Sequence, residues 1–193
     1  ALGYDAGVEY EKELVVAVID KRKRVVSSIQ WKVEEYSAYT KLGDGSLRFD
    51  TARYQLAEDV RAFGLVFNSS AIPPGCADWN RGDQLILLVP DGKSLRPVLS
   101  LYRIVQQSIE GCISVQVPDA IWEDAMLTIH IENSHTNGFR DLRVTANIYP
   151  QSNGAPIDQP RVEHVIFRYD GKRYKPSGEV PWWLDFWGEL PGS

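Results

Sequence analysis

The stretch Met126–Tyr149, MLTIHIENSHTNGFRDLRVTANIY, decides the expected fold. Apolar and polar residues alternate over Met126–Ile131 and again over Leu142–Tyr149. A period of two is typical of β-strands with one buried face. Between the two segments lies Asn137-Gly138, a dipeptide that strongly favours a two-residue hairpin turn because both residues tolerate positive φ. The stretch therefore predicts an antiparallel β-hairpin.

Short strands and tight turns continue in both directions from this hairpin. One upstream hairpin is expected to turn at the basic run Lys21–Arg24, and another at Asp91-Gly92. Downstream, Val162–Tyr169 is expected to form a further strand. We predict a mainly β fold that is antiparallel and sandwich-like.

Two segments could instead form short helices, which would make the fold α+β. We expect one strand that ends at Tyr54 and another over Val60–Phe67, but Asp50–Phe63 also has apolar residues at near-helical spacing and is compatible with a short helix. Pro118–Asp124 is expected to form one helical turn, capped by Asp119, with Trp122 docked on the sheet.

The length of 193 residues suits a single domain with one hydrophobic core. Two segments, VPDGKSLRP at Val89–Pro97 and YDGKRYKP at Tyr169–Pro176, share Asp-Gly-Lys, then an apolar or aromatic residue two positions later, then a base and a proline. This echo favours two similar β halves, about 13–110 and 111–180, before an aromatic C-terminal tail. Coincidence between common turn sequences is the alternative explanation.

Acidic residues outnumber basic ones by 26 to 21, and the formal net charge is −5. This balance argues against a nucleic-acid partner, which usually requires an extended basic surface. We interpret Lys21–Arg24 as a solvated turn beside Glu11, Glu13, Glu34 and Glu35, with an anion-binding patch as the alternative. No apolar run reaches the length of a membrane span, so none is expected.

The two cysteines, Cys76 and Cys112, lie in loop-like contexts without a CxxC motif or a nearby His at metal-ligand spacing. We expect a disulfide between them, with two buried thiols as the alternative. Disulfides form in oxidising compartments, and the chain begins Ala-Leu-Gly rather than Met. We therefore expect a periplasmic or secreted protein whose signal peptide has been removed, although a trimmed chain would begin in the same way.

The loop from Asn133 to Asp141 has the spacing of a calcium loop, with Asn133, Asn137 and Asp141 as candidate ligands. It holds one carboxylate, whereas calcium prefers several, so we favour a simple Asn-Gly turn and expect no bound metal. The chain contains no HExxH, Gly-x-Ser-x-Gly or Walker motif. We expect no catalytic residue and no cofactor.

The C-terminal segment PWWLDFWGELP concentrates Trp182, Trp183, Phe186 and Trp187. Such a cluster either packs on the core of its own domain or forms an exposed patch that binds a partner or stacks on sugar rings. We expect self-packing, because ordered termini are usually held by anchors of this kind.

The segments NGFRDLRVTANI and VIFRYDGKRYKP, within Asn137–Pro176, resemble small exported bacterial β-domain proteins that include periplasmic lysozyme-inhibitor-like proteins. In those proteins a Gly-x-x-Asp-Leu strand precedes an aromatic-x-Tyr-Asp-Gly-Lys-x-Tyr hairpin. The inhibitory Ser-Gly-x-x-Tyr loop of that family has no counterpart, since Ser177-Gly178 is followed by Glu, Val and Pro. The resemblance implies an exported β-domain.

We expect a non-enzymatic exported or periplasmic binding protein, either an inhibitor or an immunity protein that acts on a secreted or cell-wall enzyme. The alternative is a carbohydrate- or cell-wall-binding module that uses the C-terminal tryptophans, and an unrecognised hydrolase ranks third. The partner is thus a protein or a glycan, and the oligomeric state is open. Candidate binding residues are Trp182, Trp183, Trp187, Asp170, Lys172 and Tyr174.

Overall fold

The computed structural model describes residues 2–8, 10–35, 40–72 and 75–189. Within these ranges the chain forms twelve strands and one short 3-10 helix, η1 (Trp182–Leu184). The strands are β1 (Leu2–Val8), β2 (Glu11–Ile19), β3 (Val25–Glu34), β4 (Leu47–Gln55), β5 (Arg61–Phe67), β6 (Trp79–Asp91), β7 (Ser94–Glu110), β8 (Ile121–Thr136), β9 (Phe139–Ser152), β10 (Ala155–Pro156), β11 (Arg161–Tyr169) and β12 (Tyr174–Ser177).

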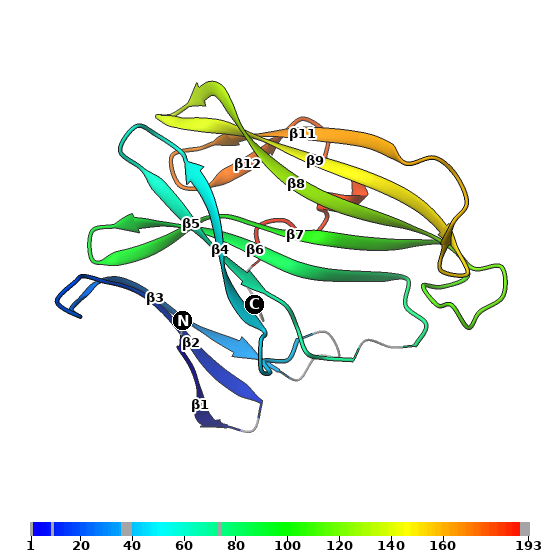
Figure 1. Cartoon of the computed structure of the whole chain (residues 1–193), viewed down its shortest axis with the longest axis horizontal. Helices are drawn as coiled ribbons and strands as arrows, with labels where there is room; N and C mark the ends of the chain where they lie inside the picture. Colours follow the sequence, from blue (N-terminus) through cyan, green and yellow to red (C-terminus); the bar gives the residue numbers. More distant parts are fainter. Residues whose placement is uncertain (1, 9, 36–39, 73–74, 190–193) are drawn as a thin grey trace.

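The strands form one sheet in the order β1-β2-β3-β7-β8-β9-β11-β12, and β4, β5 and β6 join it through β7. Every pairing is antiparallel except a single parallel bridge between Ser28 of β3 and Ser94 of β7. In Figure 1, β8, β9 and β11 run along one side of the molecule and the β2–β3 hairpin lies at the opposite side. The prediction of a mainly β, antiparallel fold is confirmed.

Two hydrophobic cores lie on opposite faces of β6. Leu85 and Leu87 point into the main core, which also contains residues of β8, β9, β11 and η1. Ile86 and Leu88 point into a second core, where they pack with Leu14 of β2 and other residues of β2 and β3. Because both faces of β6 are covered there, its segment Leu85–Val89 is an unbroken apolar run rather than an alternating one.

The strands β4–β7 and the strands β8, β9, β11 and β12 have matching order and register. Phe63 pairs with Leu88 in the first set, and Leu142 pairs with Phe167 in the second. Leu88 pairs with Pro97, and Phe167 pairs with Pro176. Each residue of the second set comes 79 positions after its equivalent in the first set, and the same spacing separates Asp91 from Asp170. The same register therefore recurs in the two sets of strands, and β1–β3 lie outside both sets; the division into two halves at about 13–110 and 111–180 stays a prediction.

The strand expected to end at Tyr54 is present, whereas the helical alternative for Asp50–Phe63 and the helical turn predicted at Pro118–Asp124 are both wrong. Asp50–Phe63 contains the end of β4 and the beginning of β5, which pair with each other. Asp119 has a φ of 60°, which an α-helix does not allow, and β8 begins two residues later at Ile121. Trp122 is a strand residue that pairs with Ser108 of β7. Pairing with neighbouring strands, rather than local helical spacing, therefore determines the secondary structure of both segments.

The predicted hairpin turns are present. Asn137 and Gly138 have φ angles of 49° and 87°, as the Asn-Gly turn requires. The basic run Lys21–Arg24 joins β2 to β3, and Asp91 and Gly92 lie where β6 turns into β7. Among the described residues, no helix has both the length and the apolar character needed to cross a membrane.

Candidate functional site

The C-terminal segment packs on its own domain, as expected. Trp183 is only 1% exposed, and both it and Leu184 belong to the main core. The indole Nε1 of Trp183 donates a hydrogen bond of 2.8 Å to Glu163 Oε2. This hydrogen bond, together with the neighbouring Arg161 guanidinium, lowers the pKa of Glu163 below its usual value. Trp183 is therefore a structural anchor.

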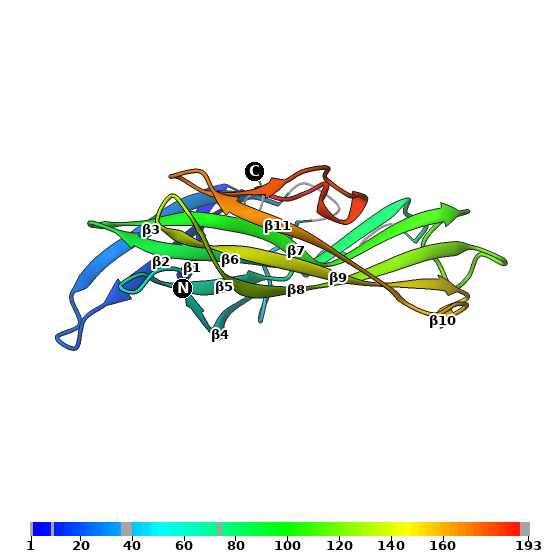
Figure 2. The same ribbon diagram turned by 90° about the horizontal axis from the view of Figure 1, so that it is seen from above.

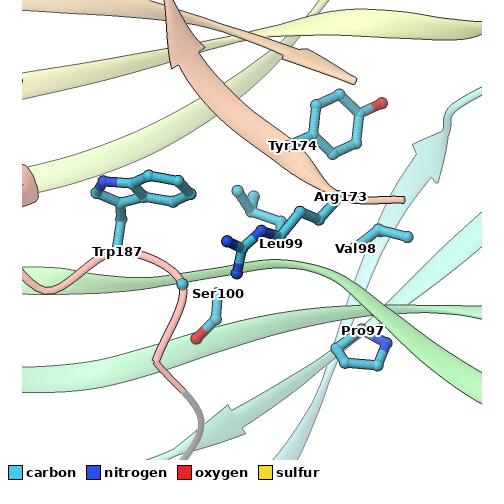
Figure 3. A pocket seen from close by; sticks show the side chains of 8 residues that line it. Pro97, Val98, Leu99, Ser100, Arg173, Tyr174 and Trp187 are labelled. Carbon is cyan, nitrogen blue, oxygen red and sulfur yellow. The ribbon is translucent and has the colours of Figure 1, made fainter. Parts of the chain in front are cut away.

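Trp187 lines a small cavity that Figure 3 shows between β7, β12 and the C-terminal segment. The cavity has a volume of about 190 Å³, and its wall includes Leu99, Arg173 and Tyr174. The Arg173 guanidinium lies 5.7 Å from the centre of the Trp187 ring system. Tyr174 is buried and donates a hydrogen bond of 2.7 Å to the carbonyl of Arg140. The wall is thus largely apolar, and the Tyr174 hydroxyl already has a hydrogen-bond partner.

Asp170 and Lys172 lie in the turn between β11 and β12. The Asp170 carboxylate accepts hydrogen bonds from the backbone N–H groups of Lys172 and Arg173 and pairs with Lys175 at 2.8 Å. These interactions hold the pKa of Asp170 well below its usual range, with the hydrogen bond from Lys175 as the largest cause. Asp170 thus stabilises the turn, while the Lys172 side chain is exposed.

A second cavity, which we call the aromatic cleft, joins the C-terminal segment to the first residues of β6. Its aromatic walls are Trp79, Trp182 and Phe186. Trp182 is the first residue of η1, and Phe186 lies in the turn that follows this short 3-10 helix. The Trp79 and Phe186 rings contact each other in a tilted arrangement, with their centres 4.7 Å apart and their planes at 36°. The cleft has a volume of about 190 Å³.

An arginine closes one side of this aromatic group. The Arg81 guanidinium lies 4.5 Å from the ring centre of Phe186 and 4.7 Å from that of Tyr102. Glu189 accepts a hydrogen bond of 2.9 Å from Arg81 and so holds it in place. Burial raises the pKa of Tyr102 to about 12, which keeps its phenol neutral. The same guanidinium lies 5.1 Å from the centre of the Trp79 ring, so Arg81 contacts both Phe186 and Trp79.

The disulfide between Cys76 and Cys112 is present, with the two Cα atoms 5.2 Å apart. Cys76 precedes Asp78 and Trp79, two residues that line the aromatic cleft, by two and three positions. The backbone N–H of Ile113 donates to the carbonyl of Ala77, and that of Ser108 donates to the carbonyl of Asp78. The disulfide and these bonds hold Trp79 against β7, so the cross-link supports the cleft as well as the fold.

The calcium-like loop forms a hairpin turn. The side chain of Asn137 donates a hydrogen bond of 2.7 Å to the carbonyl of Tyr169, and Asp141 is buried and accepts one from Ser134. Asn133 is exposed. Over the described part of the chain, no three His, Cys, Asp or Glu side chains gather closely enough to hold a metal ion.

The turn between β2 and β3, which we call the hairpin tip (Ile19–Val26), carries exposed apolar and basic side chains. Ile19, Val25 and Val26 are 60%, 63% and 50% exposed. Lys21, Arg22 and Lys23 are also exposed, and none has a carboxylate partner within the described residues. Figure 2 shows this hairpin extending away from the rest of the sheet at one end of the molecule.

Asp20 fixes the conformation of the hairpin tip. Its carboxylate accepts hydrogen bonds of 2.8 Å and 3.0 Å from the backbone N–H groups of Arg22 and Arg24. It also pairs with the Arg24 guanidinium at 2.7 Å. The bonds from Arg24 are the main reason why the pKa of Asp20 lies below its usual value. The tip is therefore a defined loop in which three cations remain uncompensated.

The expected solvated turn at Lys21–Arg24 is present, but its placement beside the four glutamates is wrong. Glu11 pairs with Glu34 across the strands, whereas Ile19 pairs with Val25, so the glutamates lie at the other end of the hairpin. There, Glu11 and Glu35 form ion pairs with Lys32 and Lys12. The glutamates and the basic run are close in the sequence, but β2 and β3 are long enough to place them at opposite ends of the hairpin.

Of the residues singled out in the sequence, Trp182, Trp183 and Trp187 enter three different environments. Trp183 enters the core, Trp182 lines the aromatic cleft and Trp187 lines the cavity of Figure 3. Sequence reasoning missed Trp79 and Arg81, because they lie about a hundred residues before the tail. The only signal was Trp79 three residues after the paired Cys76.

The whole chain was compared with protein-family models, with curated proteins and with solved structures. None of the three comparisons finds a match.

Proposed function

We propose that this chain is a non-enzymatic, exported binding protein that blocks the substrate cleft of a lytic glycoside hydrolase with its hairpin tip. The observation that carries the proposal is the composition of the tip, where exposed β-branched residues adjoin three cations without carboxylate partners. The disulfide supports a place in an oxidising compartment.

The apolar part of the tip gives a reason for association. Ile19, Val25 and Val26 lie close together on one loop and are at least half exposed. Covering the exposed part of each side chain with a partner would contribute about 1 kcal/mol. Clustered exposed apolar residues with a polar surround are typical of interaction sites.

The rigid loop lowers the cost of binding. The three contacts of Asp20 hold the loop backbone and the Arg24 side chain in one conformation before any partner arrives. Preorganisation reduces the conformational entropy that association would otherwise lose. A projecting loop of this kind suits insertion into a concave partner.

The charge of the tip indicates the kind of partner. Glycoside hydrolases generally carry a pair of Asp or Glu residues in the substrate cleft, so the cleft is acidic. Lys21, Arg22 and Lys23 complement such a cleft, and opposite charges speed the encounter of two proteins. Because the chain as a whole has a net charge of −5, attraction would favour approach by the tip.

The resemblance of Asn137–Pro176 to lysozyme-inhibitor-like proteins leads to the same class of partner. That family inhibits through a Ser-Gly-x-x-Tyr loop, which this chain lacks after Ser177. We assign the blocking role to the hairpin tip instead.

A lysis assay tests the proposal. Purified lysozymes and lytic transglycosylases would be mixed with the protein, and the clearing of a cell-wall suspension would be followed. We expect inhibition of at least one enzyme by the wild-type protein. The triple variant Lys21→Glu, Arg22→Glu, Lys23→Glu should lose that inhibition.

A charge-matched variant provides the control. Arg53, Arg61 and Arg168 are exposed, lie outside the tip and have no ion-pair partner within the described residues. Their replacement by Glu changes the net charge equally and should leave inhibition intact. The proposal fails if the wild-type protein inhibits no enzyme of the panel, or if both triple variants lose inhibition to the same extent.

A further inference from the structure

We infer that the aromatic cleft is a carbohydrate-binding site that takes one pyranose ring of a β-linked, gluco-configured glycan. The inference is independent of the proposed function, because none of the residues that line the cleft belongs to the hairpin tip. It rests on the shape of the cleft, on its aromatic walls and on the polar groups along its rim.

The aromatic walls suit the flat faces of such a sugar. In a gluco-configured β-pyranose the hydroxyl groups are equatorial, so both ring faces present C–H bonds. These faces pack on planar indole rings, which combine a large apolar area with little conformational freedom. Trp79 and Trp182 are both half-buried within the cleft, and each comes from a segment that is firmly held.

The positions of the walls are set before a ligand binds. Trp79 follows the disulfide and pairs with Gln107 of β7, and Trp182 precedes the buried anchor Trp183. Phe186 is held by its tilted ring contact with Trp79 and by the Arg81 guanidinium. A preformed site of this kind loses little entropy on binding.

The polar rim suits sugar hydroxyl groups. The carboxylates of Asp78 and Asp185 are exposed and line the cleft. The amide of Gln107 also lines it. None of these three side chains has a hydrogen-bond partner within the described residues. Carboxylate oxygens accept hydrogen bonds from hydroxyl groups, and an amide can both donate and accept.

The size of the cleft limits the ligand to one ring. Its volume of about 190 Å³ is below the range of about 300–1,000 Å³ that is typical of drug-sized ligands. It corresponds to about six water molecules at about 30 Å³ each. A glycan would therefore insert one unit, and the rest of the chain would extend into solvent.

Titration of the intact, oxidised protein with cellotriose and with chitotriose tests the inference. Tryptophan fluorescence and calorimetry would be the two measurements. We expect at least one of the two sugars to bind with a dissociation constant of roughly 1 mM or lower and to change the emission spectrum. Replacement of Trp182 by Ala should weaken binding about tenfold or more.

Two further variants separate loss of the site from loss of the fold. Gln107→Ala removes a side chain without a partner, so the protein should fold normally and bind the sugar about threefold to tenfold more weakly. Trp187→Ala removes a half-buried tryptophan from the other cavity and should leave the affinity unchanged.

Three outcomes would overturn the inference. The first is the absence of binding of either sugar at about 10 mM. The second is an equal loss of affinity in the Trp187→Ala and Gln107→Ala variants. The third is binding of choline in the cleft in place of both sugars, because aromatic rings beside carboxylates also attract quaternary ammonium ions.

Discussion

The hairpin tip and the C-terminal segment both combine bulky apolar residues with charged ones, but the fold treats them in opposite ways. The C-terminal segment buries Trp183 and Leu184 in the main core. The tip leaves Ile19, Val25 and Val26 exposed on a loop held by its own hydrogen bonds. A cluster of apolar residues in the sequence therefore does not by itself predict burial, because burial depends on whether the fold supplies residues for it to pack against.

The largest expected effect is in the C-terminal segment. Trp183→Ala would leave a cavity in the main core and remove the hydrogen bond to Glu163, so we expect a loss of about 3–5 kcal/mol in the free energy of unfolding. Urea denaturation followed by circular dichroism measures it. Val26→Ala, in the tip, should change stability by less than about 0.5 kcal/mol. Similar losses in both variants would contradict the contrast.

The next effect concerns the cross-link beside the aromatic cleft. Cys76→Ser with Cys112→Ser removes a bond that spans 36 residues, and we expect a loss of about 3–4 kcal/mol on the chain-entropy account. Urea titration of the oxidised wild-type protein and the double variant measures the loss. If the wild-type protein inhibits an enzyme, that inhibition should persist in the folded variant, because the hairpin tip lies outside the 76–112 segment that the disulfide closes. A variant as stable as the wild type would show that the disulfide is dispensable.

A smaller effect should depend on pH. The pKa of Glu163 is lowered in the folded protein, so the stabilisation due to its ionised form is complete above the unfolded pKa of about 4.3 and is lost as the pH falls through the folded pKa. At neutral pH we expect Glu163→Gln to cost about 1 kcal/mol, a value reduced for the partial exposure of this carboxylate. Thermal melts from neutral to acidic pH would compare the two proteins. If the difference in melting temperature between the wild type and Glu163→Gln stayed the same at acidic pH, the ionised Glu163 carboxylate would not be the source of the stabilisation.

The smallest effect on stability is expected in the tip. The triple replacement of Lys21, Arg22 and Lys23 by Glu should change the free energy of unfolding by less than about 0.5 kcal/mol, since these side chains have no described partner. Urea denaturation is again the measurement. A large loss would mean that the cations stabilise the fold and would remove the basis for a binding role.

Much of the fold could be predicted from the sequence, because period-two alternation and turn dipeptides are local signals. Asn137-Gly138 is an example, as its two positive φ angles follow from the residue types. The predictions failed where distant partners decide the structure. Trp122 belongs to a strand because β7 and β9 flank it, and a local helix signal could not reveal either neighbour.

The candidate sites were less predictable for the same reason. The aromatic cleft brings Trp79 to Trp182 and Phe186 through the disulfide and the path of the tail, neither of which is a local pattern. The exposure of the tip depends on how far β2 and β3 extend beyond the core. The sequence signals were the paired cysteines and the basic run itself.

The central claim is that the hairpin tip enters the cleft of a lytic glycoside hydrolase, and site-specific photo-crosslinking tests it most directly. A benzophenone-bearing residue at Val26 keeps the apolar character of the position and leaves the three cations in place. With an inhibited lysozyme, we predict that the cross-link maps to peptides that carry the catalytic carboxylates, and that the same probe at Arg168 gives none. Cross-links from Arg168, or from Val26 to the surface of the enzyme away from its cleft, would contradict the account.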